Sequence, residues 1–142
     1  MFMIATGACM SYFYQPDYSR NDFSGYHELD AGKKKNLSLM TRYGKKNVAY
    51  DLVIYQTGCS DCHKAQKKLN TAVKMKRLHG RVIVLDVNDF TKKELTSFKY
   101  TPPDLLVQKR WINSPTVAKM KGNKVLHAVT NGDEKRMLAL LK

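Results

Sequence analysis

A chain of 142 residues, 43% of them hydrophobic, is long enough to form one globular domain with a buried core. The formal net charge of +13 would suit a nucleic acid or an anionic membrane as partner. The 25 Lys and Arg are spread along the chain, however, and no nucleic-acid-binding motif accompanies them, so a solvated basic surface is the preferred interpretation. Three cysteines are too few for a secreted disulfide scaffold, which favours a chemical role for two of them.

The N-terminal region has the composition of a leader. Residues 1–10 are largely apolar but too short to span a bilayer, and small residues precede Cys9 in a loose likeness to a lipoprotein cleavage box. Residues 11–26 mix polar residues with aromatics and show no period. We therefore expect a flexible leader or anchor remnant over 1–24 and a globular domain over 25–142. The apolar stub favours an extracytoplasmic, membrane-associated bacterial location, with a cytoplasmic one left open.

The first half of the domain predicts a short edge strand at 26–29, a helix over 34–43 and a buried strand over 48–55. Gly44 is the expected C-terminal cap of the helix. The strand runs toward Gly58, where two cysteines open an amphipathic segment with Ala65 and Leu69 on its apolar side. This segment predicts a second helix, in which Cys62 faces inward and Cys59 stays nearer solvent.

The second half continues the alternation with a buried strand over 81–87, which predicts a parallel crossover onto the first strand. Residues 91–94 form a capping box that predicts a helix reaching 98–100, and a further helical segment is expected over 104–111. The segments 116–120 and 125–129 predict an antiparallel hairpin, and residues 133–141 a closing helix. The fold class expected is α/β, with a central mixed sheet flanked by helices.

The pair Cys59 and Cys62 is the strongest candidate for chemistry. Two cysteines separated by two residues can close a small disulfide ring, and the free N–H groups of a helix start favour a thiolate on the first sulfur. We expect Cys59 to attack and Cys62 to resolve. Gly58, Asp61 and His63 would modulate the pair, because His63 and nearby lysines favour the thiolate while Asp61 opposes it.

This order of elements, with Gly58-Cys59-Ser60-Asp61-Cys62 and the later Ser114-Pro115-Thr116, resembles the thioredoxin superfamily from about Tyr26 to the C-terminus. The resemblance implies a thioredoxin-like fold, a cis-proline at Pro115 lying against the dithiol, and pairing of the Ser114 backbone with a substrate peptide. It implies thiol–disulfide exchange with cysteine-containing protein substrates and with a redox recycling partner. No metal or organic cofactor is required.

The sequence departs from thioredoxin itself around the dithiol. Gln56-Thr57-Gly58 replaces the tryptophan-rich lead-in, and Val53 lies near the position of the family's buried acid. Asp51 lies too far up the strand to replace that acid, so the acceptor of the Cys62 proton is open.

Three other interpretations remain open. Cys59 to His63 also fits the haem-attachment pattern Cys-x-x-Cys-His, which would require a small helical protein. A zinc site would need a second pair of ligands, and His27, His79 and His127 are scattered, as expected of surface or loop residues. The remaining alternative is a thioredoxin-like binding or assembly accessory of a secretion or bacteriocin-transport type system, with the dithiol secondary.

Overall fold

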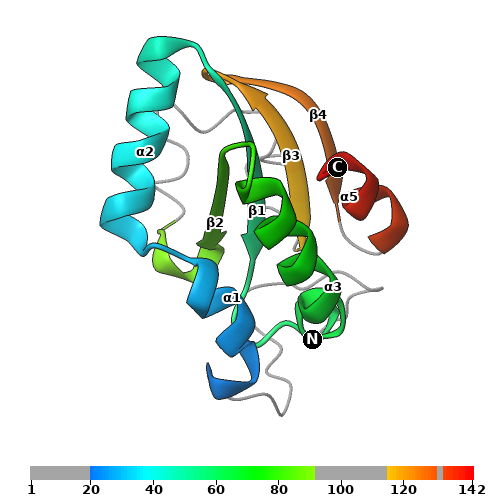
Figure 1. The fold of residues 1–142 in the computed structure, drawn as a ribbon. Helices are drawn as coiled ribbons and strands as arrows, with labels where there is room; N and C mark the ends of the chain where they lie inside the picture. Colours follow the sequence, from blue (N-terminus) through cyan, green and yellow to red (C-terminus); the bar gives the residue numbers. More distant parts are fainter. Residues whose placement is uncertain (1–19, 92–114, 131–132) are drawn as a thin grey trace, which may run out of the picture.

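The computed structural model describes residues 20–91, 115–130 and 133–142 (Figure 1). The helices and strands within these ranges are η1 (Arg20–Phe23), α1 (Ser24–Leu29), α2 (Lys33–Lys46), β1 (Ala49–Tyr55), α3 (Ser60–Arg77), β2 (Val82–Asp86), η2 (Val87–Asp89), β3 (Thr116–Lys121), β4 (Lys124–Thr130) and α5 (Glu134–Leu140).

The four strands form one mixed sheet in the order β2-β1-β3-β4. β1 is parallel to β2 and antiparallel to β3, and β3 and β4 form the predicted hairpin. Six of the seven residues of β1 are buried, so its apolar run does not alternate with polar residues. The α/β class, the parallel β1–β2 pair and the hairpin are thus confirmed.

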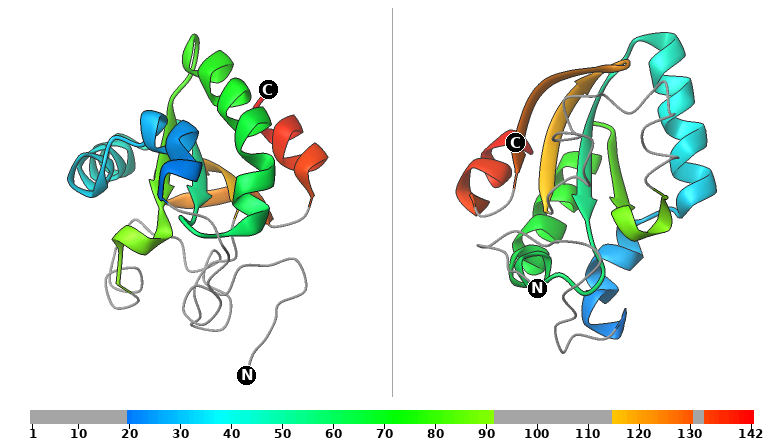
Figure 2. Two further views of the ribbon diagram at one scale, coloured as in Figure 1. Left: turned by 90° about the horizontal axis from the view of Figure 1, so that it is seen from below. Right: turned by 180° about the vertical axis from the view of Figure 1, so that it is seen from behind.

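Helices cover both faces of the sheet (Figures 1 and 2). α2 packs on one face, where Met40 meets Leu52 and Ile54 of β1. α1, α3 and α5 pack on the other face, where Val53 and Tyr55 of the same strand belong to their core. Successive residues of β1 therefore serve opposite cores, as the pleat of a strand requires.

The end of α2 differs from the prediction. The helix continues past Gly44 to Lys46 and is capped by Asn47, whose φ of 53° is left-handed. The Asn47 N–H donates to the carbonyls of Gly44 and Tyr43. Asparagine tolerates this conformation better than most non-glycine residues, and the expectation of a glycine cap at residue 44 was wrong.

The predicted leader and edge strand are also wrong from residue 20 onward, because η1 and α1 are helical there. Tyr26 and Leu29 are three residues apart and both buried, which is helical spacing rather than the alternation of a strand. Phe23 is fully buried in the same core. Aromatic residues that looked like an irregular leader thus pack against α3.

Several predictions lie outside the described residues: the helices expected over 92–111, the role of Ser114, and everything proposed for residues 1–10, including Cys9. Within the described ranges, none of the helices has the length and apolar character needed to cross a membrane. The same ranges contain no group of three or more His, Cys, Asp or Glu side chains arranged to hold a metal ion.

Candidate active site

The turn from β1 into α3 brings the first cysteine to a helix N-terminus. Gly58 has a φ of 98°, a conformation that side chains with a Cβ rarely adopt. The N–H of Cys59 donates to the Gln56 carbonyl at 3.1 Å, which closes the turn. Cys59 has extended backbone angles and is the N-cap of α3.

The two cysteines are adjacent through the first turn of α3. The backbone N–H of Cys62 donates to Sγ of Cys59 at 3.4 Å, as the side chain of an N-cap residue accepts from an N–H of the first turn. This N–H and the positive end of the helix dipole favour negative charge on the Cys59 sulfur.

Both cysteines are buried, with Cys59 3% and Cys62 0% exposed. The inward position of Cys62 is confirmed, but the prediction that Cys59 stays nearer solvent was wrong. Cys59 is disulfide-bonded, whereas Cys62 is a buried thiol, so the structure does not join the two to each other.

Pro115, 56 positions after Cys59 in the sequence, lies beside the same turn. It immediately precedes β3 and lines a pocket together with Asp61 and Ala65 of α3. Strand pairing explains this arrangement, because β3 begins opposite the end of β1, with Thr116 paired to Ile54. Pro115 therefore lies near the first two turns of α3, and its contact with the dithiol stays a prediction.

A buried carboxylate from β2 holds the turn that precedes Cys59. Asp86 accepts hydrogen bonds from the Thr57 hydroxyl at 2.5 Å, the Thr57 N–H at 3.3 Å and the Asn88 N–H at 2.9 Å. Burial raises the pKa of Asp86, and these hydrogen bonds lower it only in part. His27 adds a contact from α1, with Nε2 3.1 Å from the Thr57 hydroxyl. Helix α1 and the end of β2 thus converge on the cysteine turn.

Helix α1 also contacts the cysteine-bearing end of α3 directly. The Tyr26 hydroxyl donates to the Cys62 carbonyl at 2.6 Å, and the Tyr26 ring stacks on Tyr55 with centroids 4.5 Å apart. Gln66 accepts from the Tyr26 N–H at 3.2 Å and donates to the Asp22 carbonyl at 2.8 Å. The helices lie so close that a Cβ on Gly25 would be 1.9 Å from the Asn70 amide nitrogen.

We predict that Tyr26→Phe lowers the free energy of unfolding by about 1–2 kcal/mol, because the Cys62 carbonyl loses a buried hydroxyl donor. Tyr50 provides a matched control, since its hydroxyl is buried and has no hydrogen-bond partner among the described residues, and burial raises its pKa to about 12. Tyr50→Phe should be neutral or slightly stabilising. Urea unfolding of both variants measures the difference, and an equal loss from both would contradict the role given to the Tyr26 hydroxyl.

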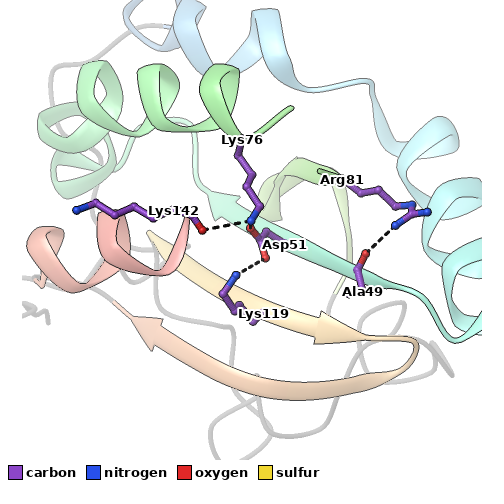
Figure 3. Close-up of polar contacts among 6 residues, drawn as sticks. All are labelled: Ala49, Asp51, Lys76, Arg81, Lys119 and Lys142. Atoms are coloured by element: carbon purple, nitrogen blue, oxygen red, sulfur yellow. Dashed lines mark hydrogen bonds and ion pairs between the residues drawn. The ribbon is translucent and has the colours of Figure 1, made fainter. Parts of the chain in front are cut away.

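Asp51 lies near the start of β1, away from the cysteine turn that follows the end of the strand (Figure 3). It is 4% exposed, with Oδ1 3.3 Å from Nζ of Lys119 and Oδ2 3.8 Å from Nζ of Lys76. Lys76 also donates to the carbonyl of the terminal residue Lys142 at 3.3 Å. Asp51 therefore joins α3, β1 and β3 at one end of the sheet, in agreement with the view that it does not replace the buried acid of thioredoxin.

Sequence reasoning missed four residues around the turn: Tyr26, His27, Asp86 and Glu134. Tyr26 and His27 lay in the supposed edge strand, where their contacts with α3 and Thr57 could not be anticipated. Asp86 did carry a signal, because a carboxylate that ends a buried apolar strand needs hydrogen-bond partners. Glu134 opens α5 and reaches the site only through the packing of α5 on α3.

No protein-family model and no curated protein matches this sequence. A solved structure described as "a putative oxidoreductase with a thioredoxin fold" superposes with a TM-score of 0.52 and 12% sequence identity. The match covers 82% of this chain and 96% of the other. Haem attachment would require a small helical protein. The four-stranded sheet with helices on both faces disagrees with that interpretation, as does the similarity to a thioredoxin fold. The chain therefore has a thioredoxin-like fold.

Proposed function

We propose that the protein is a thiol–disulfide oxidoreductase that acts on cysteine-containing proteins through Cys59 and Cys62. The observation that carries the proposal is the hydrogen bond from the Cys62 N–H to Cys59 Sγ at the start of α3, beside Pro115. A sulfur in that position is stabilised as a thiolate, and the thiolate is the attacking species in exchange.

In the reductive direction, the reaction starts from the dithiol form. The Cys59 thiolate attacks one sulfur of a client disulfide, a Cys59–client bond forms, and the other client sulfur leaves as a thiolate. The Cys62 thiolate then attacks Cys59 Sγ and displaces the client, so that the client gains two electrons and a Cys59–Cys62 disulfide remains. A redox partner must then reduce that disulfide.

Cys62 is a buried thiol in the first turn of α3, three residues after Cys59, and would be the resolving group. The Ser114 backbone, which precedes Pro115, would position the client peptide.

The test is reduction of insulin disulfides by protein first treated with excess dithiothreitol. The wild type should accelerate reduction, and Cys59→Ser should fall to the background rate of dithiothreitol alone. Equal rates for the two proteins, or no acceleration by the wild type with several reductants, would refute the proposal.

The accessory-module alternative uses the same surface without chemistry, and the near-complete burial of both sulfurs favours it. It predicts that a Cys59→Ser/Cys62→Ser double variant keeps full partner binding. The oxidoreductase predicts instead that covalent capture of clients disappears in that variant.

A further inference from the structure

A pocket of about 170 Å³ opens beside the cysteine turn. Its walls come from three elements that are distant in sequence: the first two turns of α3, the residue before β3 and the first turn of α5. The residues that line it are Asp61, Lys64, Ala65, Pro115, Glu134 and Met137. A client peptide held against Pro115 would place a side chain near its target cysteine in this pocket.

The pocket is apolar inside. Ala65, Pro115 and Met137 are all buried, and Met137 is only 1% exposed. An aliphatic chain that entered the pocket would bury the small apolar surface that these residues leave open to it, which is a small favourable contribution.

Charge is arranged unevenly around this apolar surface. Asp61 and Glu134 are partly buried, whereas Lys64 and Lys68 extend into solvent. Glu134 has an ion pair with Lys68 at 3.2 Å, but the Lys68 side chain is 68% exposed, so the pair is weak and exchangeable.

Asp61 is the less compensated of the two carboxylates. Partial burial raises the pKa of Asp61, and the nearby Lys64 lowers it only in part. The carboxylate accepts no hydrogen bond or ion pair from the described residues. A cation that reached Asp61 would therefore stabilise its ionised form.

We propose that this pocket selects clients with a lysine or arginine side chain close to the target cysteine. The aliphatic stem would pack on Met137 and Pro115, and the cationic group would lie between Asp61 and Glu134. The inference rests on the proposed function, because it names the substrate class of the same site. This preference of the pocket for cationic side chains is opposite to the long-range effect of the whole chain, whose net charge of +13 attracts acidic peptides.

The experiment uses short peptides whose single cysteine is joined to thionitrobenzoate, so that exchange with the reduced protein releases a coloured thiol. The residues on either side of the cysteine are varied in turn among Arg, norleucine and Glu. Arg peptides should react about three- to tenfold faster than norleucine peptides, and Glu peptides should be slowest.

Glu134→Gln should reduce the ratio of the Arg rate to the norleucine rate, because the cationic group loses one of its two carboxylate partners. Glu28→Gln is the matched control, because Glu28 is an exposed carboxylate that pairs with Lys74 elsewhere on the surface, and this variant should keep the wild-type ratio. A change in the reactivity of the Cys59 sulfur would alter the Arg and norleucine rates equally, so the ratio of the two rates reports recognition of the side chain alone.

Equal rates for all peptides, or a preference for Glu, would overturn the pocket's selectivity and leave the exchange reaction standing. An absence of exchange with every peptide would instead refute the proposed function, and the selectivity with it.

Discussion

Cys62→Ser should convert a transient covalent complex into the main product of the reaction. Without the second thiol, the described part of the chain offers no other thiol to attack Cys59 Sγ, so a client that reacts with Cys59 stays attached. The serine hydroxyl cannot replace the thiolate as nucleophile at neutral pH. Non-reducing electrophoresis and peptide mapping should reveal a client joined to Cys59.

The double variant Cys59→Ser/Cys62→Ser is the control and should capture no client through this site. If complexes joined through Cys9 accumulated instead, Cys9 rather than Cys59 would be the attacking cysteine. Rapid turnover by Cys62→Ser would contradict its resolving role.

Asp51→Asn should lower the free energy of unfolding by about 2 kcal/mol, which is the largest stability loss that we expect from removing a single charge. The carboxylate is 4% exposed and approached by two ammonium groups, and the amide leaves those two like charges partly buried without their counterion. Urea unfolding at low and high salt measures the effect. Since buried pairs are poorly screened, most of the loss should remain in 1 M salt.

Glu28→Gln is again the matched control, because it also removes one carboxylate charge and one ion pair. Both partners of the Glu28–Lys74 pair are more than half exposed, so this change should cost less than about 1 kcal/mol and become negligible in high salt. Equal losses from Asp51→Asn and Glu28→Gln would contradict a buried cluster at the start of β1.

Much of the fold could be predicted because local patterns and tertiary packing agree. The apolar run of β1, the amphipathic period of α3 and the glycine turn of the hairpin each specify one element. The order of these elements then restricts the topology. The expectation that Pro115 lies near the cysteine turn came from the thioredoxin resemblance rather than from the residues alone.

The N-terminal helices could not be predicted because their stability comes from tertiary contacts. η1 and α1 are too short to be stable in isolation, and their sequence carries few strong helix formers. Tyr26 is held by Cys62, Gln66 and Tyr55, all of which lie later in the chain. Cys59 and Cys62 belong to the same buried cluster as Phe23 and Tyr26, a cluster that the sequence pattern alone did not reveal.

The parallel comparison of insulin reduction by the pre-reduced wild type and Cys59→Ser remains the most direct test of exchange through Cys59. We predict a rate proportional to wild-type concentration and a rate for the variant that cannot be distinguished from dithiothreitol alone. A Cys59→Ser protein as active as the wild type would contradict the assignment of Cys59 as the reacting sulfur.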